Sequence, residues 1–330
     1  IFLDVARFAL IAVGVGMIFA YVWGANVGGL FTALGVTSIV LGLALQNSVG
    51  QIISGLLLLF EQPFRLGDWL DTPSARGRVV EVNWRATHID TGSGLQIMPN
   101  SVLAGASFTN LSRPEASYSL SIVSTFAPSD PPDQVCALLT DVARRLPHRR
   151  QDAPVKAVSV GGNDYRTTIP LRSPADDGAA KATFLRWVWY AARRAELHLD
   201  GVADDFGTPE RLAKACRYMA TALRLSHTDQ QELLTHAVLT RYGVDEAIQT
   251  AGDVPTCMSF IVAGRAQVTV RGSDGTVAPV RTLHPGEFLG QSALTREATR
   301  TSVHAVEETT MLQVERDFLE ELVMRNPLLL

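Results

Sequence analysis

The sequence predicts a multidomain membrane protein, with transmembrane α-helices, a small β domain, an α/β (α+β) domain and a β-rich C-terminal domain with flanking helices. The first observation is that no Asp, Glu, Lys or Arg occurs in the 53 residues 8–60. This is room for two apolar helices of about 20 residues each. The second is that charged residues return at ordinary density from Glu61 onward. The third is that strand-like alternation then gives way to segments with helical periodicity.

Composition excludes several classes of function. A net charge of -4 argues against nucleic acid as a partner. The three cysteines, Cys136, Cys216 and Cys257, show no CxxC spacing, which favours a reduced cytosolic setting. The seven histidines are dispersed, so the sequence predicts no metal site and no cofactor. No nucleophile–base pairing or Walker-type loop occurs either, so we expect no catalytic residues and no enzyme.

The charge-free run predicts a helical hairpin. Residues 8–23 form most of the first helix, residues 26–29 a turn, and residues 30–60 a second helix. Positive residues mark the cytoplasmic side of a membrane, and they flank the hairpin at both ends: Arg7, Arg65, Arg76 and Arg78. We therefore expect a multi-pass protein of the inner membrane with its C-terminal domains in the cytoplasm. Because the chain begins at Ile1 and not at Met, we also expect sequence upstream.

Composition and turn residues place the domain boundaries. The predicted order is a transmembrane helix and turn (1–29), a second helix with a kink (30–60), a β domain (61–114), an α/β domain (115–204), a linker helix (205–222) and a C-terminal domain (223–330). Thr208 followed by Pro209 predicts the start of the linker helix. Thr228 with Gln231 predicts a capping box for the next helix. A final helix is expected at about residues 317–325.

The second apolar helix carries two neighbouring stripes. Residues three and four apart share a helix face, and small residues let transmembrane helices pack closely. One reading is a helix–helix contact inside one chain. The sharper reading is a ring of copies around an axis, closed by rings of large apolar side chains that gate by dewetting. The small packing stripe is Gly35, Ser38 and Gly42, and the constriction residues are Ile39 and Leu43.

Polar and small residues follow the constriction. Gln46 and Asn47 at membrane depth are costly unless they face water or protein, so we place them at the inner mouth of the pore. Gly50 and Gly55 have weak helix propensity, and they mark where the helix is expected to kink.

These motifs resemble the mechanosensitive channels of small conductance, the MscS family. The resemblance rests on GLALQ, PFRLGD, a spaced pattern of Thr87, Gly94, Pro99 and Asn100, and the N-x-S-R motif at residues 110–113. It implies a homoheptamer whose last transmembrane helix lines the pore, above a cytoplasmic cage built from a β domain and an α/β domain. It also implies that Ile39 and Leu43 form the two constrictions, and that Asn47 stands at a kink position often held by Gly.

The C-terminal region resembles a cyclic nucleotide-binding domain. The matching motifs are RYG followed by AI, FIVxGR at residues 260–265 and LxPGEFxG at residues 283–290. The resemblance implies a β-roll, a short helix that binds the cyclic phosphate, and cAMP or cGMP as the candidate ligand. Exposed amides at a helix N-terminus bind phosphate. The predicted nucleotide-binding residues are Gly290, Gln291, Ser292, Ala293, Arg300 and Thr301.

This region departs from the family at three places. Gln291 stands where the family has an acid that holds the ribose. Thr299 stands at the phosphate-binding arginine, and Arg300 occupies the next position. A one-residue adjustment of the loop would bring Arg300 to the phosphate, and Arg296 is a weaker substitute; a pocket that binds nothing is the alternative. The lid helix of the family would begin at Asn326, so we expect it beyond Leu330.

Three functions follow. The first is a homo-oligomeric channel, of the bacterial cyclic nucleotide-gated type, gated or modulated by intracellular cyclic nucleotide and by membrane tension. The second is a channel whose C-terminal domain is structural and binds no nucleotide. The third is a non-conducting, membrane-anchored signalling scaffold. The expected partners are the lipid membrane, further copies of the chain and a cyclic nucleotide.

Overall fold

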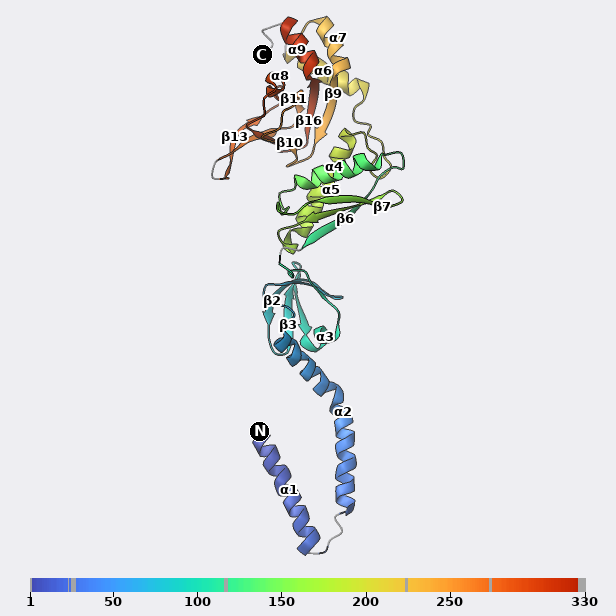
Figure 1. Ribbon diagram of the computed structural model, residues 1–330, viewed down its shortest axis with the longest axis vertical. Coiled ribbons are helices and arrows are strands. Elements are labelled where there is room, and N and C mark those ends of the chain that lie inside the picture. Colours follow the sequence, from blue (N-terminus) through green and yellow to red (C-terminus); the bar gives the residue numbers. More distant parts are fainter. Residues whose placement is uncertain are drawn as a thin grey trace. The chain divides into compact units, whose positions relative to one another are not determined.

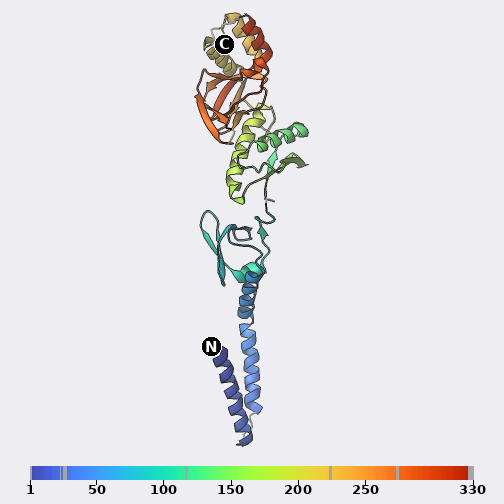
Figure 2. The same ribbon diagram turned by 60° about the vertical axis from the view of Figure 1, so that its left-hand side comes forward.

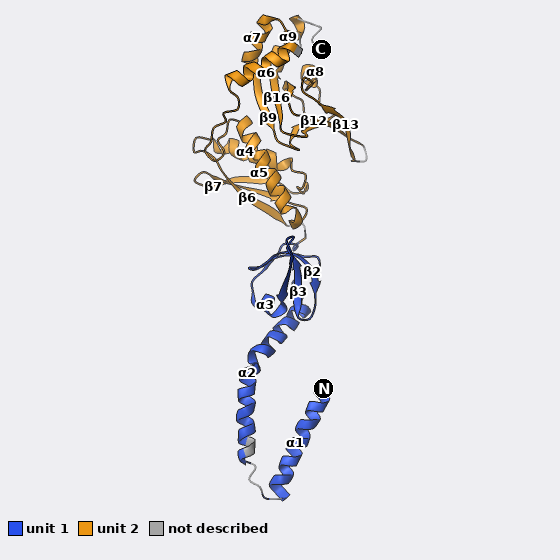
Figure 3. Cartoon of the chain, turned by 180° about the vertical axis from the view of Figure 1, so that it is seen from behind, with its two compact units in different colours: residues 1–114 blue, residues 115–330 orange. Residues whose placement is uncertain are grey.

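A computed structural model describes residues 2–22, 24, 28–115, 118–222, 225–272 and 275–325. Trp23, Asn26, Leu223 and the predicted lid start at Asn326, together with residues 273–274, lie outside the described residues. The chain divides into two compact units, residues 1–114 and residues 115–330 (Figure 3).

The first unit begins with two apolar helices. They are α1 (Phe2–Val22) and α2 (Gly28–Glu61), and both contain spans long and apolar enough to cross a membrane. Gly28 and Gly29 belong to the first turn of α2, so the predicted turn at residues 26–29 is wrong at these two positions. A glycine at a helix start tolerates helical and turn geometry alike, which is why the sequence could not separate them. The axis of α2 changes direction part-way along, while the segment stays helical throughout (Figure 1).

A small antiparallel β domain completes the first unit. Its sheet has the order β4-β3-β2-β1-β5, and α3 (Asn100–Gly105) follows β4. The last turns of α2 and one face of α3 contribute to a core that includes Leu58, Leu70, Ile89 and Leu103. The strands are β1 (Trp69–Asp71), β2 (Arg76–Val82), β3 (Ala86–Asp90), β4 (Leu95–Pro99) and β5 (Thr109–Asn110).

The second unit begins with an α+β domain. A three-stranded antiparallel sheet, in the order β6-β8-β7, packs against α4 (Pro132–Arg144) and α5 (Asp177–Arg194). Leu139, Ile169 and Phe184 are fully buried in the core between them. Because the sheet is antiparallel, the domain is the α+β form of the predicted α/β class. The strands are β6 (Ser119–Thr125), β7 (Lys156–Gly161) and β8 (Asp164–Pro170), with a short 3₁₀ helix at Pro174–Asp176.

The C-terminal domain combines two four-stranded antiparallel sheets with a group of helices. The sheet orders are β14-β11-β16-β9 and β10-β15-β12-β13, and α6, α7 and α9 gather at one end of them (Figures 1 and 2). The helices are α6 (Pro209–Ala222), α7 (His227–His236), α8 (Ser292–Thr295) and α9 (Arg316–Arg325). The strands are β9 (Ala237–Tyr242), β10 (Ala247–Gln249), β11 (Cys257–Ala263), β12 (Ala266–Arg271), β13 (Val277–Leu283), β14 (Phe288–Leu289), β15 (Ser302–Ala305) and β16 (Thr309–Glu315).

Two predicted helix starts have different outcomes. The prediction at Thr208 is confirmed, because α6 begins at Pro209 and the Thr208 hydroxyl accepts a hydrogen bond from the Arg211 amide at 3.3 Å. The predicted cap at Thr228 is wrong. The N-cap of α7 is Ser226, whose hydroxyl accepts from the Asp229 amide at 3.2 Å and donates to the Asp229 carboxylate at 2.6 Å. Both capping patterns occur in overlapping register, and the geometry selects the earlier one.

Candidate functional site

The predicted constriction residues project from α2 without covering side chains of their own chain. Ile39 and Leu43 are each 65% exposed. The small stripe is open as well, since a Cβ added at Gly35 or Gly42 would meet no atom within 4 Å. The Ser38 hydroxyl donates a hydrogen bond to the Leu34 carbonyl oxygen at 2.7 Å, so this polar group has a partner within its own helix. The stripe can therefore receive a close neighbour from outside the chain.

The predicted inner mouth and kink divide into two environments. Gln46, Asn47 and Gly50 are exposed, and a Cβ at Gly50 would meet no atom within 4 Å. Gly55 is buried, and a Cβ there would lie 3.2 Å from the Cβ of Asn100. The sequence predicted Gly55 as a kink, and its packing against α3 was missed. Local sequence patterns around Gly55 could not have revealed a contact with a residue 45 positions further along the chain. The position of the bend among these residues stays a prediction.

The Thr87 and Asn100 motif residues lock the β domain together. The Thr87 hydroxyl, fully buried, donates to the Asn100 side-chain oxygen at 2.9 Å. The Asn100 amide group donates to the Asn83 carbonyl oxygen at 2.9 Å. Asn100 is 1% exposed, and its side-chain oxygen and its side-chain amide group each have a hydrogen-bond partner, as is usual for buried polar groups. This asparagine fixes the start of α3 beneath Gly55.

A second set of motif residues converges on Asp68. The Asn110 side chain donates to the Asp68 carboxylate at 2.9 Å and to the Pro63 carbonyl oxygen at 3.2 Å. Arg113 pairs with the same carboxylate at 3.4 Å. Ser112 accepts from the Trp69 amide at 2.9 Å. The PFRLGD and N-x-S-R motifs therefore join the two ends of the β domain, and their role there is structural.

The predicted phosphate-binding segment forms a tight turn and a single helical turn. Gly290 has φ +90°, and a Cβ there would lie 2.8 Å from the Cys257 carbonyl oxygen, so both conformation and space favour glycine. Gln291 is exposed, Ser292 half-buried and Ala293 fully buried. The Ala293 amide donates to the Gly290 carbonyl oxygen at 2.9 Å, so it is not free for a ligand. The four-residue α8 has only a small dipole to offer an anion.

Thr299 and Arg300 lie on opposite sides of the backbone. Thr299 is 8% exposed, and its hydroxyl donates to the Thr250 carbonyl oxygen at 2.9 Å. Its amide and carbonyl group also pair with Asp253 and Gly252. Arg300 and Arg296 are exposed, and Arg296 pairs with Glu320 at 3.7 Å. The predicted adjustment that would bring Arg300 to the phosphate stays a prediction.

Thr301 meets a partner that the sequence did not indicate. The Gln249 side-chain amide donates to the Thr301 carbonyl oxygen at 3.2 Å and lies 3.4 Å from its hydroxyl. The Gln249 side-chain oxygen is buried without a hydrogen-bond partner among the described residues. This polar group is therefore available beside the predicted nucleotide-binding residues.

Comparison with known families now assigns both regions. Residues 47–113 match the family described as "Mechanosensitive ion channel, beta-domain", and residues 239–326 match "Cyclic nucleotide-binding domain". The chain carries an MscS-family β domain and a C-terminal cyclic nucleotide-binding domain. Both resemblances inferred from the motifs are confirmed. The MscS family is a channel family and not an enzyme family, in agreement with the expectation that the chain is no enzyme.

Curated relatives match a part of the chain. An uncharacterised MscS family protein of Bacillus subtilis, YhdY, is 32% identical over 108 residues, which is 32% of this chain and 29% of that protein. The low conductance mechanosensitive channel YnaI of Escherichia coli is 33% identical over 28% of this chain and 27% of its own length. The chain thus covers under a third of the length of these relatives.

Solved structures are similar to parts of the chain. Helicobacter pylori MscS in its closed state is 21% identical over 63% of this chain and 83% of its own, with a TM-score of 0.49. A cyclic nucleotide-binding domain from Methylobacillus flagellatus is 17% identical over 38% of this chain and 72% of its own, with a TM-score of 0.33.

Proposed function

We propose that the chain is a subunit of a homoheptameric ion channel of the bacterial inner membrane, opened or modulated by an intracellular cyclic nucleotide and responsive to tension. The observation that carries this proposal is the exposed face of α2 in a chain that ends in a cyclic nucleotide-binding domain. Ile39 and Leu43 line the pore, Gly35, Ser38 and Gly42 pack against the neighbouring copy, and Gln46 and Asn47 form the inner mouth.

The exposure along α2 supports a pore-lining role. Large apolar side chains that no part of the chain covers need lipid or protein around them, because water would make their exposure costly. A purely lipid-facing anchor gains nothing from a small stripe on one face and Gln46 and Asn47 beyond it. A ring of copies accounts for all three features. Large apolar side chains can face lipid, the small stripe can pack against the neighbouring copy, and Gln46 and Asn47 can face the water of the pore.

With seven nucleotide sites in one channel, a modest preference of the ligand for one of the two states at each site would be sufficient to shift the channel between closed and open. A ligand shifts a closed–open equilibrium only through its different affinities for the two states. A full swing requires about 10⁴-fold in total, which is about 4-fold for each of seven sites. Gln291, without the charge of the family's acid, is compatible with a preference of this size.

A patch-clamp pressure ramp on the expressed protein tests the proposal. The ramp is recorded with and without cAMP or cGMP on the cytoplasmic face. We expect the open probability at fixed tension to change with nucleotide. Current that follows tension identically with and without either nucleotide would overturn the ligand part, and an absence of any current would overturn the channel itself and favour the scaffold.

Thr299 favours a second candidate function, in which the C-terminal domain is structural. A neutral, buried threonine that already donates to Thr250 provides no positive charge at the position where the family places its arginine. Calorimetry of the full chain in detergent with cAMP and cGMP separates the two functions. Binding heat supports the sensor, and its absence together with normal tension-gated current supports the structural domain.

A further inference from the structure

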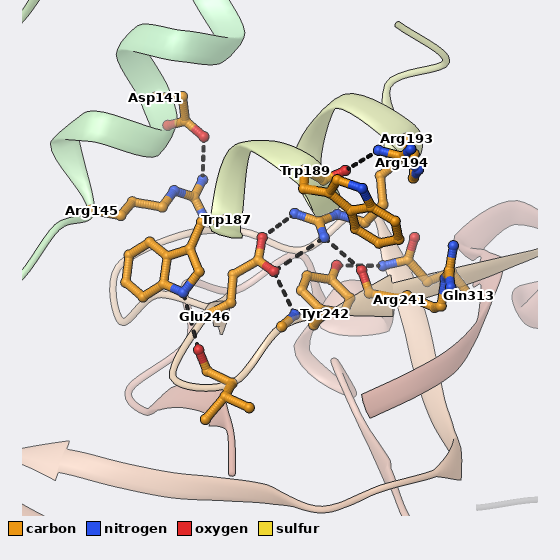
Figure 4. Close-up of polar contacts among 12 residues, drawn as sticks. Asp141, Arg145, Trp187, Trp189, Arg193, Arg194, Arg241, Tyr242, Glu246 and Gln313 are labelled. Atoms are coloured by element: carbon orange, nitrogen blue, oxygen red, sulfur yellow. Dashed lines mark hydrogen bonds and ion pairs between the residues drawn. The ribbon is translucent and has the colours of Figure 1, made fainter. Parts of the chain in front are cut away.

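A short turn of the cyclic nucleotide-binding domain docks on α5 of the α+β domain, within the second unit. This docking turn is residues 243–246, between β9 and β10. Glu246 is 4% exposed, and the Arg194 guanidinium forms a two-point ion pair with its carboxylate (Figure 4). The same guanidinium donates to the Arg241 carbonyl oxygen at 2.6 Å and lies 4.2 Å from the centre of the Tyr242 ring.

Further contacts secure both ends of the docking turn. The Glu246 carboxylate accepts from the Gly243 amide at 2.8 Å. The Trp187 indole N–H donates to the Val244 carbonyl oxygen at 3.1 Å. Outside the docking turn, the Tyr190 hydroxyl of α5 donates to the Glu308 carboxylate at 2.6 Å. The Glu246 carboxylate is buried and the Arg194 guanidinium is mostly buried, so separating them is costlier than separating an exposed pair.

The opposite face of α5 belongs to the core of the α+β domain. Phe184, Val188 and Ala192 are at most 1% exposed there. Trp187 is 4% exposed and belongs to the same core, while its N–H reaches the docking turn. A displacement of the docking turn therefore acts on a helix that cannot move independently of its domain.

Hydrogen bonds link the docking turn to the predicted nucleotide site through β10 and β15, with one shift in register between Ala247 and Gln249. The Asp245 amide donates to the Ala305 carbonyl oxygen at 2.8 Å, and the Ala305 amide donates to the Glu246 carbonyl oxygen at 3.0 Å. β10 continues from there and pairs with β15. Beyond it, the Gly252 amide donates to the Thr299 carbonyl oxygen at 2.8 Å. Glu246 and Thr299 thus lie at the two ends of one paired segment.

We propose that the docking turn is the joint through which the cyclic nucleotide-binding domain acts on the α+β domain, with the Arg194–Glu246 ion pair as its coupling contact. Occupancy of the site around Gly290 and Thr299 shifts β15 and β10, and the ion pair carries that shift to α5. Arg194 is a positioning residue and does not touch the ligand. The inference rests on the proposed function, since it requires a nucleotide-dependent current.

The test measures binding and current separately in the full chain. Three variants are compared with the unchanged protein, with cAMP and cGMP as probes. Arg194→Ala removes the ion pair, and Trp187→Phe removes only the indole hydrogen bond while keeping an aromatic ring in the core. Arg186→Ala is the matched control, because Arg186 pairs at 3.7 Å with Asp245 of the same turn, yet their side chains are 42% and 76% exposed.

We expect Arg194→Ala to bind nucleotide within about two-fold of the unchanged protein but to reduce the nucleotide-induced change in open probability by about 10-fold or more. Trp187→Phe should lose a smaller share of the response, and Arg186→Ala should keep it within about two-fold. A full response with normal binding in both Arg194→Ala and Trp187→Phe would overturn the joint alone. If Arg194→Ala fails to fold, Trp187→Phe decides: a reduced response supports the joint and a full response overturns it. No response in the unchanged protein would overturn the proposed ligand gating and the joint with it.

Discussion

The helices α2 and α5 present opposite patterns of burial. α2 has 34 residues, and its membrane-length window is only 11% buried by the rest of the chain. α5 has 18 residues and is covered on two sides, by the core of its own domain and by the docking turn. Apolar residues dominate α2, whereas α5 alternates apolar positions with Arg186, Arg193 and Arg194.

The difference indicates where the partners of each helix lie. α5 finds its partners inside the chain: Arg186 and Arg194 pair with carboxylates, and Phe184, Trp187 and Val188 are buried. α2 finds few, so lipid or further copies of the chain are needed to cover it. Mutations at the exposed positions of α2 should therefore change conduction with little effect on the folding of the chain. Mutations around α5 should affect folding and the link between the two domains of the second unit.

The largest expected effect is on α2. Leu43→Ser should hydrate the constriction and raise the resting current at zero applied tension by about tenfold or more, because a polar ring no longer excludes water. Cells that express it should grow slowly, and growth curves with patch recordings measure both effects. Leu45→Ser is the control, since Leu45 lies two residues further on and faces another side of the helix. Equal behaviour of the two variants would remove the distinction between the faces of α2.

The second effect is on the stability of the second unit. Arg194→Ala should lower its free energy of unfolding by about 2–4 kcal/mol, because it leaves the buried Glu246 carboxylate without its cation. The double variant with Glu246→Ala should lose less than the sum of the two single losses. Denaturant unfolding of the full chain provides the measurement. Strict additivity would show that the pair contributes no coupling energy.

The third effect is steric. A Cβ at Gly243 would lie 2.5 Å from the Tyr190 ring. Burial, followed by the Glu308 hydrogen bond, raises the pKa of Tyr190 to about 12, so the phenol keeps its proton and stays anchored. Gly243→Ala should therefore cost about 1–3 kcal/mol of stability. Gly178→Ala in the first turn of α5, where a Cβ meets no atom within 4 Å, should be neutral or stabilising. A neutral Gly243→Ala would contradict tight docking.

The smallest effect is a dependence on acid. Asp130 is 5% exposed, and burial by itself raises the pKa of its carboxyl group; the hydrogen bonds from the ring and backbone N–H of His198 outweigh burial and lower it below the ordinary value of 3.8. Its ionised form therefore stabilises the fold above that value, and the stabilisation is lost as the pH falls through the lowered pKa. The difference in melting temperature between the unchanged protein and Asp130→Asn should shrink only as the pH falls below 3.8, toward the lowered pKa of Asp130. A constant difference would contradict the assignment.

Local signals in the sequence predicted most of the fold. The apolar run, the alternating strands and the Thr208-Pro209 start all depend on neighbours within a few residues, so periodicity and capping chemistry reveal them. The motif residues also predicted both family domains. Whether Ile39, Leu43 or Arg300 perform their predicted roles depends on other copies and on a ligand.

Contacts between distant segments were beyond prediction. Arg194 and Glu246 are 52 residues apart, and each reads as an ordinary surface charge in its local context. The close approach of Gly55 to Asn100 likewise depends on how α3 folds back on α2. The correct N-cap, Ser226 and not Thr228, was missed because two adjacent capping patterns compete and only the packing of α7 decides between them.

The length of α2 has a consequence for how the first unit meets a membrane. At 1.5 Å per residue, its 34 residues extend about 51 Å, whereas the hydrocarbon layer is about 30 Å thick. The helix therefore exceeds the hydrocarbon layer by about 20 Å, and it must tilt, bend or extend beyond the lipid. Gly55 packs against Asn100 near its C-terminal end. A thinner or thicker bilayer would change how much of α2 emerges, and lipid chain length becomes a variable that acts on the β domain through one continuous helix.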